Sequence, residues 1–330
     1  MITHDTARLG RFTFPRAGIV VLAFLMVWLL PDSEAWPELL LALGCALALI
    51  VGREIGEEAP WLIPAAAVGA LAVAMLLDLP GTMSSRPLAG PLGYANVKAA
   101  LFAQGAIAGA MLGVTARSRA GRTAGWVAAG LFAIVPLFSE SVAAMVGVSG
   151  IVVLLMVPRR WAPIAIVGCG VAFLSLLMVT SLVAAGGENR LSESLDERRV
   201  LLWRDAWSAM LDSPLRGAGV DGFVESSATA SEDRDARWAH NDFLELGAEQ
   251  GIVALGLVLA AILWTYMELV ATAARTRGGG LCLLGAASLT VLVAHACVDY
   301  IAHFSIVPLV VALLVGSTLG AAQLGAKRVR

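Results

Sequence analysis

The chain has 330 residues, of which 58% are hydrophobic and only 15% are charged, and its mean hydropathy is +0.81. Soluble domains hold about 45–50% apolar and about 25% charged residues, so this composition excludes a soluble globular protein. The net charge of −2 gives no global basic field, which argues against a nucleic-acid partner. All four cysteines lie in apolar runs without a CxxC pair, so we expect buried thiols and no metal site.

The apolar runs predict an all-α polytopic membrane protein. The first run follows Arg8, Arg11 and Arg16 without a convincing cleavage site, so we interpret it as a retained span and not as a signal peptide. In chain order, we expect ten spans, at about 17–30, 38–52, 60–77, 97–116, 123–138, 142–157, 161–185, 243–270, 281–298 and 303–324.

The basic residues give an orientation, because cytoplasmic connections collect Lys and Arg. With both termini in the cytoplasm, inner segments hold 14 of the 23 basic residues. Seven others lie in one long outer connection. The expected organisation is therefore transmembrane helices 1–7 in residues 1–185, an outer, periplasmic loop at 186–242, and transmembrane helices 8–10 in 243–330.

The outer loop contains one amphipathic segment before Pro214. Its apolar residues recur at helical spacing and are Val200, Trp203, Trp207, Met210 and Leu211. We expect an interfacial helix on the outer membrane surface, with Trp203 as an anchor.

Arg199 precedes Trp203 by four residues and shares its helix face. It can hold a lipid-linked phosphate, or it can be an ordinary snorkelling arginine. After Pro214, Gly217, Gly219 and Gly222 form a turn that either approaches a ligand closely or bends the chain.

The chain re-enters the membrane at AHNDFLELGAEQG. Asn241 or Asp242 can cap this helix, with Glu245 near its first turn. His240 is either an ordinary interfacial residue or a general base, a role that suits histidine because an unperturbed imidazole titrates near neutral pH. Glu249 lies inside the span, where an acid requires a paired cation or a polar cavity.

Further polar residues occur at the outer ends of other spans. They are Asn96, Lys98, Ser139, Glu140, Ser141, His295, Asp299 and His303. Each can be a cap or a loop residue, but their common depth predicts an outward-facing polar cavity. We expect no metal site, because the spacings of His295, Asp299 and His303 place them around a turn.

The segments RRVLLWRDAWSAMLDSPLRGAGVDGF and AHNDFLELGAEQGIVALG together resemble the signature region of the O-antigen ligase and polymerase family. GPLGYANVKAA with Asn96, and HACVDYIAHF with Asp299, resemble further family segments, so the resemblance covers about 85–310. The matching positions are Arg199, Trp203, Pro214, Gly217, Gly219, Phe223, His240, Asn241, Leu244, Glu249 and Gly251. One departure is Glu140, which stands where the family commonly has an arginine that helps to hold the lipid diphosphate.

The resemblance implies a glycosyltransferase of surface polysaccharide biosynthesis, such as that of lipopolysaccharide. It would move a glycan from undecaprenyl diphosphate to a hydroxyl of an acceptor glycan or glycolipid, at the periplasmic face of a bacterial inner membrane. His240 would be the general base, and Arg199 would neutralise the departing diphosphate. Asn96, Trp203, Glu249 and Asp299 would bind substrate or support these groups. No cofactor is implied, which agrees with the lack of a GxxxxGK phosphate loop.

Two alternatives come from other classes of protein. Glu140 is compatible with an inactive or scaffold relative. A transporter of a polar or lipid-linked substrate would use Glu249 and Asp299 as ligands, but the sequence shows no internal repeat in support of it.

Overall fold

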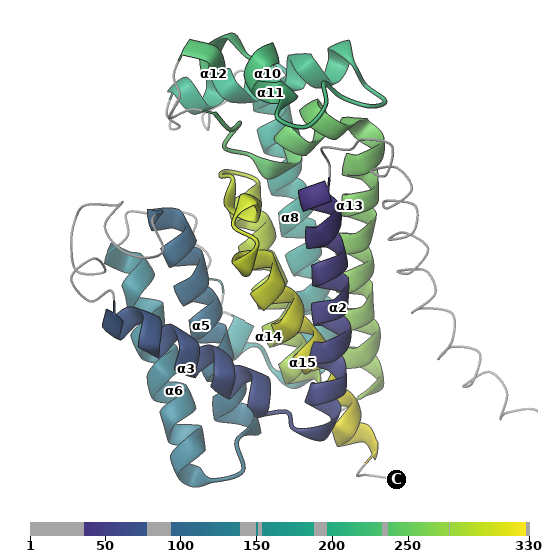
Figure 1. Cartoon of the computed structure of the whole chain (residues 1–330). Helices are drawn as coiled ribbons and strands as arrows, with labels where there is room; N and C mark the ends of the chain where they lie inside the picture. Colours follow the sequence, from purple (N-terminus) through teal and green to yellow (C-terminus); the bar gives the residue numbers. More distant parts are fainter. Residues whose placement is uncertain are drawn as a thin grey trace, which may run out of the picture. The chain divides into compact units, whose positions relative to one another are not determined.

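The computed structural model describes residues 36–77, 94–138, 150, 154–187, 197–232, 237–276 and 278–327. Every regular element among these residues is a helix (Figure 1). Six helices are long and apolar enough to cross a membrane: α2 (Trp36–Glu58), α5 (Ala95–Thr115), α8 (Ala162–Ala184), α13 (Asp242–Arg275), α14 (Gly279–Ala296) and α15 (Ile306–Lys327). The all-α class and the multi-pass membrane character are therefore confirmed.

The expected number of ten spans is not confirmed. Eight of the predicted runs fall on helices, two of which are α3 (Leu62–Leu77) and α6 (Arg119–Ile134). These two helices have 16 residues each, or about 24 Å, which is short for a hydrocarbon core of about 30 Å. The predicted span at 17–30 lies outside the described residues, as does that at 142–157 except for residues 150 and 154–157.

The chain divides into two compact units. The loop unit comprises residues 1–42 and 178–268, and the helical unit comprises residues 43–177 and 269–330. Helices α2, α8 and α13 each begin in one unit and end in the other.

In the helical unit, α5 is buried along its length from Val97 to Gly113. It contacts α3, α6, α14 and α15, as expected for a helix without a polar face. Helices α5 and α6 approach so closely that a Cβ atom on Gly109 would lie 2.5 Å from the backbone nitrogen of Ala129. Small residues thus allow van der Waals contact between backbones, which is the main source of helix association in a membrane.

Helices α2 and α15 cross in a similar way through two Gly-x-x-x-Gly pairs. The pairs are Gly52 with Gly56 on α2, and Gly316 with Gly320 on α15. A Cβ atom on Gly52 would lie 2.5 Å from the carbonyl oxygen of Leu313, and Cβ atoms on the other three would also overlap with the facing backbone. This crossing therefore requires glycine on both helices.

In the loop unit, α10 (Glu197–Asp212) contacts two short helices, α11 (Gly222–Ser226) and α12 (Ala228–Glu232) (Figure 1). The predicted amphipathic helix therefore exists and ends at Asp212, two residues before Pro214. Its place on the membrane surface stays a prediction.

The anchor role predicted for Trp203 is wrong. Trp203 is fully buried, and Val200 and Met210 on the same stripe are 7% and 6% exposed. An apolar stripe has the same sequence pattern whether it faces lipid or protein. Here Val200, Trp203 and Met210 of the stripe pack inside the protein, whereas Trp207 is half-buried and Leu211 is 61% exposed.

Candidate functional site

Two side chains at the start of α13 bind backbone N–H groups before and after His240. The Asn241 side-chain oxygen accepts hydrogen bonds from the backbone N–H groups of Phe243, at 3.2 Å, and Leu244, at 3.1 Å. The Glu245 carboxylate accepts the N–H of Ala239 at 2.7 Å. Asn241 and Glu245 are buried, so the predicted cap is confirmed, with Asn241 as the capping residue.

His240 lies between these two contacts in a left-handed backbone conformation, with φ of +51°. Its carbonyl oxygen accepts a hydrogen bond from the indole N–H of Trp203 at 3.1 Å. A left-handed residue other than glycine costs free energy and persists where the surroundings fix it. The backbone of His240 is thus fixed from α10 and from α13, while its side chain is half-buried and not enclosed.

Trp203 and His240, both predicted site residues, are therefore brought together. Arg199 lies one helical turn before Trp203 on α10 and is half-buried, whereas the neighbouring Arg198 is exposed. Side chains four residues apart on a helix are neighbours. The indole hydrogen bond consequently fixes the helix that carries Arg199 to the turn that carries His240.

The glycine turn after Pro214 packs against a break in α13. At Gly251 the helix adopts a non-helical conformation, with φ of +79° and ψ of 173°. Three backbone hydrogen bonds join the turn to this break: Ile252 N–H to Pro214 O at 2.8 Å, Ala218 N–H to Ala248 O at 2.8 Å, and Gly219 N–H to Glu249 O at 2.9 Å. The break leaves backbone N–H and C=O groups of α13 without their partners within the helix, and the turn supplies hydrogen bonds to them.

Gly217 shows why this turn needs glycine. Its φ is +70°, and a Cβ atom there would overlap with the carbonyl group of Glu249. The sequence left two interpretations of this turn, a close approach to a ligand or a bend of the chain. The structure shows a bend with a close approach, and the group that is approached is the backbone of α13.

Glu249 is half-buried, and its carboxylate accepts the N–H of Phe223, the second residue of α11, at 3.4 Å. Glu249, which was expected to lie inside a span, thus has a backbone N–H as a hydrogen-bond donor. Phe223 itself is fully buried.

Asp205 is a structural residue of this region that the sequence did not single out. Its carboxylate accepts the hydroxyl of Ser227 at 2.6 Å and the N–H of Thr229 at 3.1 Å, which fixes α12 to α10. The Ser227 hydroxyl also caps α12 by accepting the N–H of Ala230 at 3.0 Å. The SSATASE composition is typical of a cap, but nothing in the sequence identifies its partner.

In the helical unit, a second polar cluster forms around Asp299, which is 2% exposed. The Tyr94 hydroxyl donates to both carboxylate oxygens, at 2.9 and 3.0 Å, and the Tyr300 N–H donates at 2.9 Å. The Asn96 amide also donates to this carboxylate. Two residues predicted separately, Asn96 and Asp299, therefore meet although they are about 200 positions apart.

Tyr94 is the residue of this cluster that the sequence analysis missed, although it lies in the quoted GPLGYAN segment. Its ring stacks on Tyr300, with 4.9 Å between centroids, and on Phe304, with 5.8 Å. Burial, and secondly the charge of Asp299, raise the pKa of the Tyr94 phenol, so this group stays a neutral donor.

The other predicted polar residues of the helical unit are not gathered into one site. His295 is fully buried and its Nδ1 pairs with the carbonyl oxygen of Val291 at 2.8 Å, whereas His303 is exposed and meets the edge of Tyr300. Lys98 is buried. Ser139, Glu140 and Ser141 lie outside the described residues. Within the described part of the chain, no three His, Cys, Asp or Glu side chains are grouped to hold a metal.

Part of this chain matches a known protein family. Residues 124–259 match the family model described as O-antigen ligase, which confirms the predicted resemblance over that stretch. Arg199, Trp203, His240 and Glu249 lie inside the matched segment, and Asn96 and Asp299 lie outside it. A search of curated proteins found no match.

Proposed function

Because residues 124–259 match the O-antigen ligase family, we propose that this protein is a membrane glycosyltransferase of the O-antigen ligase or polymerase type. Its donor is a glycan on undecaprenyl diphosphate, and its acceptor is a hydroxyl of another glycan or glycolipid. It acts at the periplasmic face of the inner membrane, with both termini in the cytoplasm.

Beside the family match, the structural observation that carries this proposal is the His240 turn. A histidine in a left-handed conformation, fixed by Trp203, Glu245 and the Asn241 cap, has its backbone over-determined while its side chain is only half-buried. Such strain is typical of residues held for a function. Fixing the backbone limits the positions of the imidazole, which is what a general base requires.

In the reaction, the acceptor hydroxyl oxygen forms a bond to the anomeric carbon of the donor glycan. The bond from that carbon to the diphosphate oxygen breaks, and the bonding electrons leave with the diphosphate. The acceptor proton passes to the imidazole of His240. A positioned base of this kind typically contributes about 10²–10⁴-fold to the rate.

Arg199 offers a planar guanidinium that can contact two diphosphate oxygens at once. It neutralises the charge that develops as the diphosphate leaves, which is often the largest single contribution to catalysis. Its place on α10 suits this role, because Trp203 of the same helix is bonded to the His240 turn.

The remaining predicted residues have positioning roles in this proposal. Trp203 fixes the His240 turn, and Glu249 fixes α11 through Phe223. Asn96 and Asp299 tie the start of α5 to the end of α14. This departs from the expected contact of these residues with substrate.

Deletion of the gene in the native bacterium, followed by gel analysis of its surface glycans, tests the proposed function. We expect a glycan to disappear from its acceptor and to accumulate on the lipid carrier, and the wild-type gene to reverse both effects. Accumulation of a single repeat would identify a polymerase, and accumulation of a finished chain a ligase. Unchanged surface and carrier-linked glycans would contradict the proposal.

A further inference from the structure

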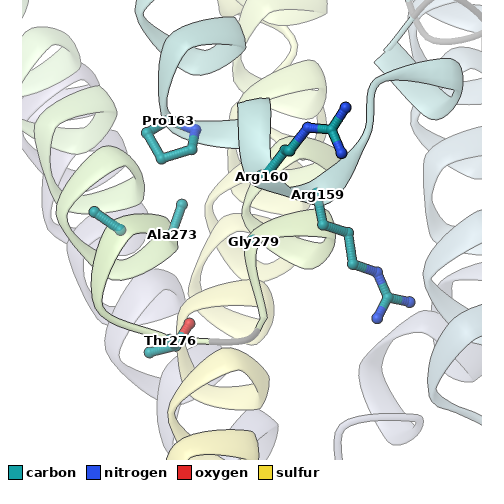
Figure 2. Close-up of a pocket in the computed structure, with 7 residues that line it drawn as sticks. Arg159, Arg160, Pro163, Ala273, Thr276 and Gly279 are labelled. Carbon is teal, nitrogen blue, oxygen red and sulfur yellow. The ribbon is translucent and has the colours of Figure 1, made fainter.

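A hollow of about 480 Å³ lies in the helical unit, far from the polar cluster around Asp299. It is lined by Arg159 and Arg160 in the turn before α8, by Pro163 of α8, by the end of α13 with Thr276 after it, and by Gly279 at the start of α14 (Figure 2). The start of α14 packs closely here, since a Cβ atom on Gly279 would lie 3.2 Å from the carbonyl oxygen of Arg159.

The charge of the hollow has one sign. Its lining contains two arginines and no acidic residue. Among the residues that the structure describes, neither guanidinium has an ion-pair partner. The hollow is therefore suited to an anion, and guanidinium groups favour phosphate oxygens in particular.

The surroundings place the hollow at the depth of lipid headgroups. Directly after the arginines, Trp161 is 49% exposed, and Ile164, Val167 and Val171 of α8 are also exposed. An apolar exposed helix face that begins with tryptophan and arginine is typical of a membrane interface.

The hollow and the Asp299 cluster lie at opposite ends of α14. This helix has 18 residues, or about 27 Å, which is close to the thickness of the hydrocarbon core. The hollow therefore faces the leaflet opposite to the Asp299 cluster. The distribution of basic residues assigns that leaflet to the cytoplasmic side.

We propose that this hollow binds the phosphate of an anionic phospholipid headgroup in the cytoplasmic leaflet. Its volume exceeds that of a phosphate ion. In Figure 2 the two guanidinium groups leave one turn in different directions, which provides reach and not a closed clamp. Both features favour a lipid headgroup over a small free anion. Basic hollows between membrane helices on the cytoplasmic side are known to take such headgroups.

Native mass spectrometry of the full-length protein in detergent, titrated with phosphatidylglycerol or phosphatidylcholine, tests the proposal. We expect one phosphatidylglycerol to bind in preference to phosphatidylcholine. The double variant Arg159→Gln with Arg160→Gln should bind it about 30-fold more weakly, from about fivefold for each arginine near a membrane surface. Ala274→Trp, at an exposed position of the lining, should also weaken binding by filling the hollow without changing its charge.

The matched control is Arg117→Gln with Arg119→Gln. These two arginines are exposed and lie at the start of α6, with Arg117 before the helix and Arg119 as its first residue, but they do not line the hollow. An equal loss in both double variants would overturn the proposal in favour of general surface charge. Equal binding of the two lipids, or full displacement of the lipid by millimolar inorganic phosphate, would also overturn it.

Discussion

The turn around His240 and the cluster around Asp299 are both groups of polar residues at the end of a membrane helix, but their hydrogen bonds involve different atoms. At His240, the hydrogen bonds hold the backbone, and the imidazole and the nearby Arg199 stay half-buried. At Asp299, the carboxylate itself accepts three donors and is 2% exposed.

The His240 turn is therefore suited to present a reactive side chain, whereas the Asp299 cluster is suited to hold helices together. A carboxylate with its acceptor capacity used by Tyr94, Asn96 and Tyr300 has little left for a substrate. At His240 it is the carbonyl oxygen, and not the side chain, that accepts the hydrogen bond from Trp203. We therefore expect substitutions at the two places to fail in different ways, the first in activity and the second in stability.

The largest expected effect is on activity, for Arg199→Ala. Loss of a group that stabilises developing charge should lower glycan transfer by about 10²–10³-fold, with unchanged amounts of protein in the membrane. Arg198→Ala, at the exposed neighbouring position, is the matched control and should transfer at the wild-type level. Equal effects of the two variants on transfer would remove Arg199 from the proposed site.

Gly217→Ala should cause the largest loss of stability. It combines an unfavourable left-handed conformation with overlap onto Glu249, which together cost about 2–4 kcal/mol. At Gly219, φ is also positive, but a Cβ atom would meet nothing within 4 Å, so Gly219→Ala should cost only about 1 kcal/mol. Thermal unfolding in detergent measures both, and equal losses would argue against the packing of this turn on α13.

Asp299→Ala should reduce stability while transfer per folded molecule stays within about twofold. It removes the acceptor of the Tyr94 hydroxyl and of the Tyr300 N–H, and one of the two acceptors of the Asn96 amide. One unsatisfied buried donor costs about 1–3 kcal/mol. Tyr94→Phe removes one donor to the carboxylate and one acceptor of Asn96, whose amide still bonds to Asp299, and should have a smaller effect. A stable Asp299→Ala protein that has lost transfer would instead make Asp299 a substrate-binding residue.

The smallest expected effect on stability is that of Trp203→Phe, which removes the indole hydrogen bond to His240 and retains an aromatic ring. The lost bond is worth about 0.5–1.5 kcal/mol, and the less well-fixed turn should lower transfer about tenfold. Trp207→Phe, at a half-buried position one turn later on α10, should leave transfer unchanged. An unaffected Trp203→Phe protein would show that the His240 turn does not need this contact.

Local rules in the sequence predicted part of this structure. The cap by Asn241 and the end of α10 before Pro214 depend on residues a few positions apart, and both were predicted. The burial of Trp203 was not predicted, because helical spacing identifies an apolar stripe but does not show whether lipid or protein covers that stripe. The left-handed conformation of His240 has no signal in the sequence either.

Contacts between distant segments account for the rest. Asn96 and Asp299 were each identified as polar residues at the end of a span, but their bond, and the role of Tyr94, depend on how α5 and α14 pack. The break in α13 at Gly251 was also not predicted from the sequence. A single glycine in an apolar run indicates no break until the segment that satisfies the freed backbone groups is known.

Replacement of His240 by asparagine tests the central claim most directly. Asparagine tolerates a left-handed conformation, so His240→Asn should retain the turn while it removes the base. In a strain that lacks the gene, we predict that this variant is present in the membrane at the wild-type level and with wild-type thermal stability, yet does not restore the surface glycan, whereas His303→Asn restores it. Full restoration by His240→Asn would contradict the account.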